Sequence, residues 1–150
     1  RCPRARAGCP PPDPRTASSW SWIGGHADGE MDLAAVALRE LEEETGVVAS
    51  QLVHWGKFSQ SSTSPIYSVE VLTVNGHEKR GAYVGSHLHL NVTYLAIADP
   101  CAPLRIKPDE NSGVQWVPLK DAITLSSEPW IRERIYRKLI EKMESYLAKR

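Results

Sequence analysis

Three glutamates, Glu40, Glu43 and Glu44, lie at spacings of three and four residues within one short acidic stretch. At about 100° per residue of an α-helix, their side chains fall within an arc of about 100°. Like charges at these spacings repel, so a helix gains no stability from placing them together. Hard divalent cations such as Mg²⁺ take carboxylate oxygens as ligands. The pattern predicts a cation-binding helix, and its alternative is the solvated acidic face of a surface helix.

The acidic residues need a helix and a loop to position them. Residues 33–45 are rich in Ala, Leu, Arg and Glu and predict that helix. Asp32 is a plausible N-cap, and Gly46 stands where a left-handed C-cap glycine belongs. The core-facing side of the helix is expected to consist of Leu33, Ala34, Ala37, Leu38 and Leu41.

The rest of the chain predicts a mixture of strands and helices. Apolar alternation and β-branched residues indicate strands over 19–23, 51–62, 66–74, 86–97 and 114–119. The segment 75–81 indicates a turn, with Asn75-Gly76 as its strongest signal. A short helix is expected over 120–125, and a final amphipathic helix begins near Pro129.

Bulk composition excludes several classes of protein. The 150 residues carry 18 basic and 18 acidic side chains, so net charge is zero, which argues against binding to nucleic acid or to a membrane surface. No apolar stretch approaches the roughly 18–20 residues of a membrane span. Three scattered cysteines predict no disulfide framework, and the expected location is cytoplasmic.

The first 19 residues differ in character from the rest. They hold five prolines and four arginines without apolar periodicity, and they lack the apolar region of a signal peptide. One interpretation is a disordered leader, and the preferred one is an aberrant start that displaced a structured N-terminus. The expected division is therefore a leader over 1–19 and one domain over 20–150.

The glycine loop and acidic helix together resemble the signature of the Nudix hydrolases. That signature is Gly, five residues, Glu, seven residues, then Arg-Glu-apolar-any-Glu-Glu-any-Gly-apolar. The matching positions here are Gly25, Arg39, Glu40, Leu41, Glu43, Glu44, Gly46 and Val47. The resemblance extends over residues 20–147. One position departs, because Met31 stands where the signature has its first Glu, with Glu30 beside it.

The resemblance implies an α/β (α+β) fold, a Nudix-like α/β/α sandwich with a mixed sheet. Strands usually precede the glycine loop in this family, and only residues 20–23 look like a strand at that place. N-terminal strands of the sheet are therefore expected to be missing, which would remove one wall of the substrate cleft.

The resemblance also implies a reaction, in which water attacks a phosphorus of a nucleoside diphosphate derivative with Mg²⁺, or Mn²⁺, as cofactor. The metal ligands would be Glu40, Glu43, Glu44 and the carbonyl of Gly25, with Arg39 orienting a glutamate. Glu110 is a further catalytic candidate, and the general base is Glu40, Glu110 or Glu30. The implied partner is a small nucleotide-type substrate, and dimers are common among relatives, so a homodimer is allowed.

Three histidines are candidates for substrate binding. His26 lies in the glycine loop, and its alternative is a simple turn residue. His87 and His89 share one strand face and could bind phosphate or a metal, whereas a satisfied pair on a sheet face is the plainer alternative. Arg105 and Lys107 could contact phosphate or be solvated loop charges.

Two other functions compete with the hydrolase. Met31 and the unusual N-terminus favour a catalytically weak or inactive module that binds a nucleotide or a protein. An isoprenoid diphosphate isomerase would need a suitably placed catalytic cysteine, and Cys101 lies in a proline-rich loop without supporting context.

Overall fold

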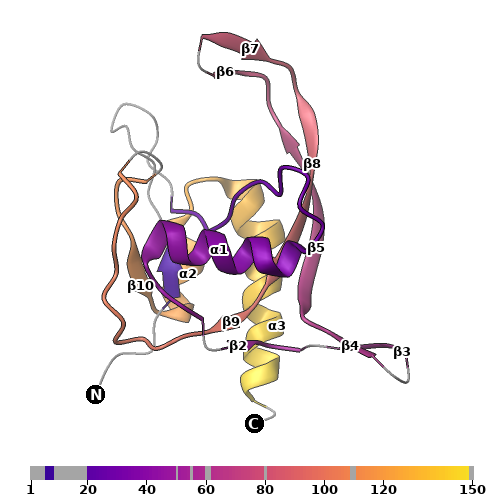
Figure 1. Ribbon diagram of the computed structural model, residues 1–150, viewed down its shortest axis with the longest axis vertical. Helices are drawn as coiled ribbons and strands as arrows, with labels where there is room; N and C mark the ends of the chain where they lie inside the picture. The colour runs from indigo at the N-terminus through magenta and orange to yellow at the C-terminus, as the bar shows by residue number, and fades with distance from the viewer. Residues whose placement is uncertain are drawn as a thin grey trace. The chain divides into compact units, whose positions relative to one another are not determined.

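The structure is a computed structural model that describes residues 6–8, 20–49, 51–54, 56–59, 62–79, 81–108 and 111–148 (Figure 1). The chain forms two compact units. Unit 1 comprises Arg1–Gln51 and Ile97–Arg150, and unit 2 comprises Leu52–Ala96. Two short strands, β2 (Gln51–Leu52) and β9 (Ala96–Ile97), lie where the chain passes between the units. The mixture of helices and strands confirms the α+β class.

Unit 1 contains all of the helices in the described part of the chain. Its elements are β1 (Arg6–Gly8), α1 (Leu33–Thr45), β10 (Gln115–Val117), η1 (Leu119–Asp121), α2 (Ala122–Leu125), the π-helical η2 (Ile131–Tyr136) and α3 (Arg137–Leu147). Strands β1 and β10 pair antiparallel, with Arg6 opposite Val117 and Gly8 opposite Gln115.

Helix α1 begins and ends where the capping residues predicted. The Asp32 carboxylate accepts a hydrogen bond of 3.0 Å from the backbone N–H of Ala35, which satisfies one of the unpaired donors of the first turn. Gly46 adopts φ of +72°, and its N–H donates to the carbonyl of Glu42 at 2.7 Å. A left-handed residue at this place is favourable for glycine because it has no Cβ.

The buried face of α1 differs in part from the expected one. Val36 is the buried apolar side chain of the helix, and Thr45 at its end is fully buried. Leu38, expected in the core, is 36% exposed. The buried side of the helix is therefore rotated from the expected one. At about 100° per residue, Val36 lies on the same side as Glu40 and Glu44.

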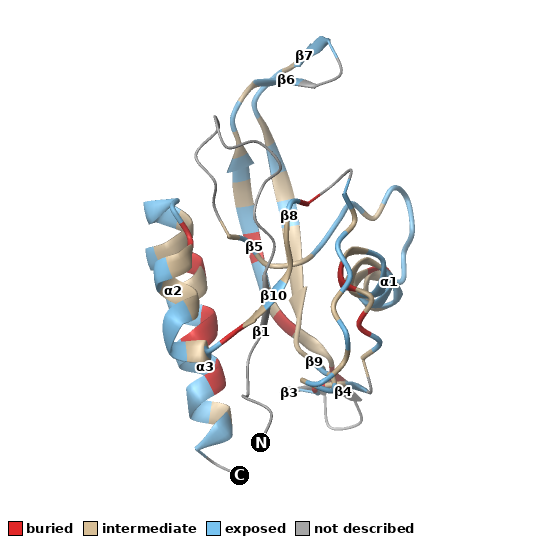
Figure 2. Cartoon of the chain, turned by 90° about the vertical axis from the view of Figure 1, so that its left-hand side faces the viewer, coloured by how far each residue is buried: buried red, intermediate tan, exposed pale blue. Residues whose placement is uncertain are grey.

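The C-terminal helical segment buries one stripe of apolar residues. Ile135, Leu139, Ile140 and Met143 are buried, whereas the charged positions between them are exposed (Figure 2). The helical spacing in the sequence predicted Ile135, Leu139 and Met143 but not Ile140, and each such side chain contributes on the order of 2 kcal/mol on burial. Leu147, at the end of the helix, is more than half exposed.

The N-terminal part of unit 1 holds a strand that the sequence did not predict. Residues 6–8 of the expected leader form β1, and the remaining residues up to 19 lie outside the described residues. The strand expected over 19–23 is reduced to a single bridge at Ser21. A domain boundary at residue 20 stays a prediction.

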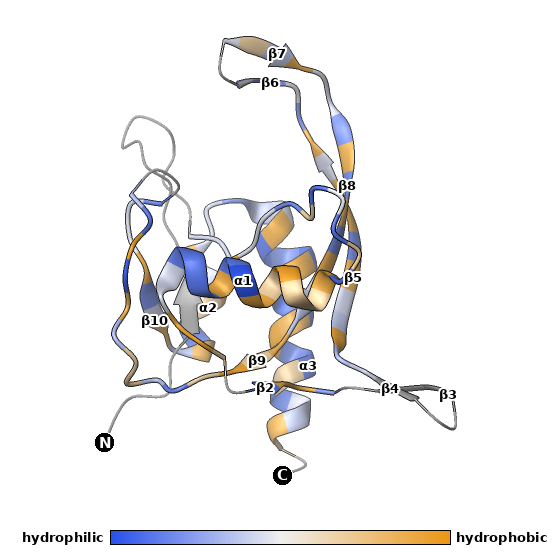
Figure 3. Cartoon of the chain, in the orientation of Figure 1, coloured by the Kyte–Doolittle hydropathy of each residue, from blue (hydrophilic) through white to orange (hydrophobic). Residues whose placement is uncertain are grey.

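The regular elements described in unit 2 are all strands. They are β3 (Gly56–Ser59), β4 (Ser62–Ser64), β5 (Ile66–Val74), β6 (His77–Lys79), β7 (Ala82–Val84) and β8 (His87–Tyr94). The longest ladder is the antiparallel pair β5–β8, in which Val74 is opposite His87 and Glu70 is opposite Asn91. Hydrophilic and hydrophobic residues alternate along β8, so the two kinds of side chain lie on opposite faces of the strand (Figure 3).

The turn expected at Asn75-Gly76 lies elsewhere. His77–Lys79 forms β6 and pairs antiparallel with β7, so the chain reverses between Lys79 and Ala82. Gly81 supplies the positive φ of +78° at this reversal. Asn75 and Gly76 instead link β5 to β6.

One expectation about the cysteines is wrong, since Cys101 is disulfide-bonded. Cys2 and Cys9 lie outside the described residues. None of the helices described in either unit has the length and apolar character needed to cross a membrane.

Candidate functional site

The glycine loop and α1 approach each other most closely at Gly25. A Cβ placed on Gly25 would lie 2.7 Å from Glu40 Oε1, and closer still to the carboxyl carbon and to Oε2. Real Cβ atoms essentially never come this close to a neighbour. The Glu40 carboxylate therefore lies against the loop backbone in a space that only glycine leaves open. Its side chain is 14% exposed, at the border between core and solvent.

A tight turn shapes the loop between Gly25 and α1. The N–H of Glu30 donates to the carbonyl of Ala27 at 2.8 Å. Asp28 and Gly29, between them, have φ of +47° and +92°. Positive φ at both central positions is typical of a type I′ turn, in which Asp and Gly are the preferred residues.

The chain entering the loop is anchored to the C-terminal helical segment. The backbone N–H of Trp22 donates to the hydroxyl of Tyr136 at 3.0 Å, and the two rings pack edge to face with centroids 4.9 Å apart. Burial raises the pKa of the Tyr136 hydroxyl to about 12, although the hydrogen bond from Trp22 opposes the shift. This anchor and the Asp32 cap hold the two ends of the loop.

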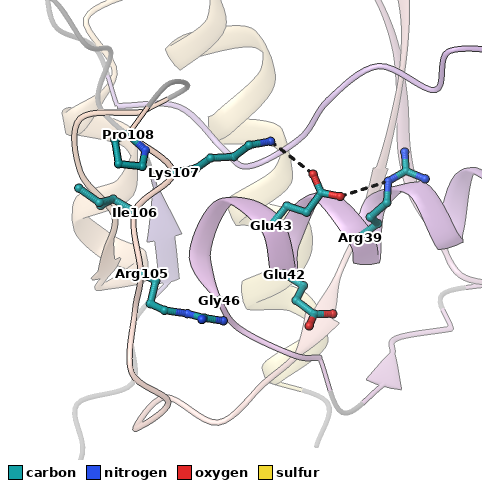
Figure 4. A pocket seen from close by; sticks show the side chains of 8 residues that line it. All are labelled: Arg39, Glu42, Glu43, Gly46, Arg105, Ile106, Lys107 and Pro108. Atoms are coloured by element: carbon teal, nitrogen blue, oxygen red, sulfur yellow. Dashed lines mark hydrogen bonds and ion pairs between the residues drawn. The ribbon is translucent and has the colours of Figure 1, made fainter.

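Two carboxylates on α1 are linked by one arginine, and Figure 4 shows its pairing with the second of them, Glu43. Arg39 Nε lies 3.7 Å from Glu43 Oε1, and Arg39 Nη2 lies 3.7 Å from Glu40 Oε1. The other oxygen of Glu43, Oε2, lies 3.3 Å from Nζ of Lys107. Glu43 thus lies between two cations, one from its own helix and one from the loop before β10.

Arg105, Lys107 and Asn111 lie at the C-terminal end of α1. The N–H of Arg105 donates to the Thr45 carbonyl at 2.8 Å, and Asn111 Nδ2 donates to the Glu44 carbonyl at 3.4 Å. The N–H of Asn111 also donates to the Lys107 carbonyl at 2.9 Å. The bonds to Thr45 and Glu44 satisfy carbonyls that a helix end leaves unpaired, and two basic residues here suit the negative end of the helix dipole.

A pocket of about 540 Å³ lies between α1 and residues 105–108. It contains three cationic side chains and two acidic ones, so its lining carries a net positive charge. The lining residues are Arg39, Glu42, Glu43, Gly46, Arg105, Ile106, Lys107 and Pro108 (Figure 4). A Cβ at Gly46 would lie 2.7 Å from Nε of Arg105, so this glycine also permits the close approach of the arginine.

Most of the residues predicted to form the site lie in unit 1, and the others lie in unit 2 or outside the described residues. Gly25, Arg39, Glu40 and Glu43 come together in unit 1, Glu44 lies on the same helix, and His26 is exposed in the loop. Glu110 lies outside the described residues. His87 and His89 lie on β8 in unit 2, so a role for them in substrate binding stays a prediction.

Sequence reasoning missed two residues that build the site. Asn111 is only 3% exposed, and its Oδ1 is buried without a hydrogen-bond partner. Tyr136 holds the loop through Trp22. No local pattern marks either residue, because each acts on a segment distant in sequence.

Glu30, the neighbour of the unusual Met31, forms a hydrogen bond to the backbone. Its Oε1 accepts a hydrogen bond of 3.0 Å from the backbone N–H of Asp32. Met31 is 89% exposed. Glu30 therefore helps to stabilise the start of α1.

The donor atoms here suit a hard divalent cation. Glu40, Glu43 and Glu44 supply carboxylate oxygens, and the space over Gly25 brings the Glu40 carboxylate against backbone. Among the described residues no three acidic, histidine or cysteine side chains already converge on one point. The chemistry of the donors fits Mg²⁺, and Glu43 would have to exchange part of its pairing with Arg39 and Lys107 to act as a ligand.

Comparisons with known proteins agree with the fold. A family model described as the NUDIX domain matches residues 5–139. An Ap4A hydrolase from C. elegans, crystallised as a binary complex, is 21% identical with a TM-score of 0.56, over 96% of this chain and 86% of that one. The E. coli ORF135 protein, solved in solution, is 15% identical with a TM-score of 0.50, over 96% and 82%. No curated protein matches significantly. Because the family model spans most of the chain, the protein belongs to the Nudix family.

Proposed function

We propose that the protein hydrolyses a diphosphate linkage in a nucleoside diphosphate derivative with Mg²⁺, for which Mn²⁺ can substitute. The oxygen of water forms a new bond to phosphorus, and the P–O bond of the anhydride breaks, so that two phosphorylated products leave. The observation that carries the proposal is the Glu40 carboxylate packed against Gly25, with Glu43 one turn further along the same helix. A rigid helix holds such ligands more firmly than a loop does.

Glu40, Glu43, Glu44 and the carbonyl of Gly25 are the proposed metal ligands. Bound Mg²⁺ neutralises the diphosphate and lowers the pKa of the attacking water. Arg39 contacts both Glu40 and Glu43, so its proposed role is to orient them. It does so from the helix surface, where its side chain is half exposed.

The general base is proposed among three carboxylates. The Glu40 carboxylate lies against Gly25 of the glycine loop, whereas the Glu30 carboxylate accepts a hydrogen bond from the backbone of Asp32. Glu40 is therefore preferred to Glu30. Glu110 stays a candidate from the sequence alone.

The basic pocket is the proposed place for substrate phosphate. Arg39, Arg105 and Lys107 line it, and Arg and Lys side chains bind phosphate oxygens through charge-assisted hydrogen bonds. Phosphate would compete with Glu43 for Lys107. This exchange would free Glu43 Oε2 when substrate enters, and so couple substrate binding to metal binding.

The substrates to be tested all contain a diphosphate linkage attached to a nucleoside. Because one protein of similar fold is an Ap4A hydrolase, a dinucleoside tetraphosphate is the first substrate to test. ADP-ribose, NADH and an oxidised nucleoside triphosphate complete the panel. A homodimer and a cytoplasmic location stay predictions.

The test measures nucleotide release from this panel with and without Mg²⁺. We expect turnover that needs the metal and falls at least about hundredfold in Glu43→Gln, which keeps the shape of the side chain but removes its charge. Glu141→Gln is the matched control, because Glu141 is an exposed carboxylate on α3. Folded protein that turns over no member of the panel would count against the proposal.

A weak or inactive binding module is the second candidate function. The specific observation is that Met31 replaces a glutamate and that the neighbouring Glu30 is bound to the backbone. Calorimetry separates the two functions. Nucleotide binding without hydrolysis would support the module, and turnover lost in Glu43→Gln would exclude it.

A further inference from the structure

Two histidines on one face of β8 point their rings at each other. His87 and His89 are two residues apart in the strand, so their side chains share a face. Their Nε2 atoms are 3.0 Å apart, and the ring centroids are 4.8 Å apart. Both side chains are partly buried.

The hydrogen bonds of the two rings indicate which ring nitrogens of His87 and His89 carry a proton. Nδ1 of His87 lies 2.8 Å from the carbonyl of Gly85, and a carbonyl only accepts, so this Nδ1 carries the proton. Neutral His87 therefore presents a bare lone pair at Nε2. His89 Nε2 must donate across the 3.0 Å contact.

This proton arrangement suits a cation better than a phosphate. A phosphate needs N–H donors, but the His87 proton is used by Gly85, and the His89 Nε2 proton is used by His87. A histidine whose Nδ1–H is bound to a carbonyl, and whose Nε2 keeps its lone pair, is instead the usual form of a metal-ligating histidine.

The surroundings of the pair also favour positive charge. Leu72 and Val74 lie opposite His89 and His87 on β5 and bring no charge. Glu70, opposite Asn91, is a diagonal neighbour of His89. It is 7% exposed, and its carboxylate accepts hydrogen bonds from Ser68 and Asn91.

We propose that His87 and His89 form a chelating site for a divalent transition-metal ion, separate from the carboxylates of α1. When the metal binds, the proton on His89 Nε2 leaves that atom for the solvent or for the other ring nitrogen, so that both Nε2 lone pairs face the metal. With metal–nitrogen bonds of about 2.05 Å, a separation of 3.0 Å corresponds to an angle near 94° at the metal. Such an angle suits the cis positions of Ni²⁺ or Cu²⁺ better than tetrahedral Zn²⁺.

Water would complete the coordination. Among the described residues no third histidine, cysteine or carboxylate is placed to join the pair. His77 is the nearest other imidazole, with its ring centroid 6.4 Å from that of His87. The proposal does not rest on the hydrolase activity, because metal binding itself is measured.

The test is calorimetric titration of the full chain with Ni²⁺ in the presence of excess Mg²⁺, which occupies the hard-ion site. We expect one Ni²⁺ per chain, and a loss of affinity of at least tenfold in His87→Asn and in His89→Asn. His54→Asn is the matched control, since it removes an imidazole elsewhere in unit 2 and should leave the affinity unchanged. Affinity that survives both strand variants, or that is lost in Glu43→Gln instead, would overturn the proposal.

A second measurement needs no variant at the site. Paramagnetic Ni²⁺ should broaden the ring ¹⁵N signals of His87 and His89 in the wild-type protein before those of His54. If these two rings stay sharp while Ni²⁺ binds, the site is elsewhere.

Discussion

Replacing Gly25 by alanine tests whether the close approach of the loop to Glu40 matters for catalysis. The new methyl group would lie 2.7 Å from Oε1 of Glu40, and ordinary van der Waals contact begins at 3.4 Å. The carboxylate must therefore move by about 0.7 Å or more. A misplacement of about 1 Å at a reacting centre can reduce the rate by about 10², or about 2.7 kcal/mol. We expect Gly25→Ala to lose between about tenfold and hundredfold in kcat.

Stability should change much less than activity. The atoms that clash belong to the end of a flexible side chain, and φ at Gly25 is not in the left-handed region. Gly24→Ala is the matched control, because a Cβ there meets nothing within 4 Å. The assay compares kcat and the unfolding midpoint of both variants with those of the wild type, at saturating Mg²⁺. Equal activity in the two variants, or a loss of kcat explained by unfolding, would refute the reasoning.

Three further predictions concern Lys107, Tyr136 and Met31. Lys107→Ala should raise KM several-fold and lower stability by less than about 1 kcal/mol, since its pair with Glu43 is exposed; steady-state kinetics and urea unfolding check this, and a fall in kcat at unchanged KM would contradict it. The pKa of the Tyr136 hydroxyl is about 12 in the folded protein, against an ordinary value of 10. The folded protein therefore holds this proton more tightly than the unfolded chain does. Stability from this group is therefore complete below pH 10 and is lost as pH rises from 10 to 12, by up to about 2.7 kcal/mol. An ultraviolet titration of wild type against Tyr136→Phe should show that a tyrosine ionising at about pH 12 is missing in the variant, and an unchanged curve would be evidence against this burial. Met31→Glu should leave stability unchanged, because the side chain is 89% exposed, and raise turnover at limiting Mg²⁺ by about tenfold; no gain would mean that residue 31 does not contribute to the metal site.

The sequence predicted helix α1, which carries the candidate site, more accurately than it predicted most of the strands. Helix α1 was predicted to the residue, because Asp32 and Gly46 are strong local capping signals. Strand β5 was also predicted with its observed bounds. Such features depend on residues that are neighbours in the chain.

The errors arise where distant residues decide the outcome. The predicted strand over 51–62 is broken into β2 and β3, and β1 forms from three residues without any strand signal because β10 provides its partner. Asn75-Gly76 is a strong local turn signal, but the pairing of β6 with β7 moved the reversal to Gly81. The pairing of Glu43 with Lys107 likewise joins residues that no local pattern relates.

The most direct test of the central claim follows oxygen from water into the products. Wild type and Glu43→Gln are incubated with Mg²⁺ and the dinucleoside tetraphosphate in ¹⁸O-labelled water, and ³¹P NMR and mass spectrometry locate the label. The account predicts one ¹⁸O in one of the two phosphorylated products of the wild type, at a rate at least about hundredfold above that of Glu43→Gln. Unlabelled products, or equal rates in the two proteins, would contradict it.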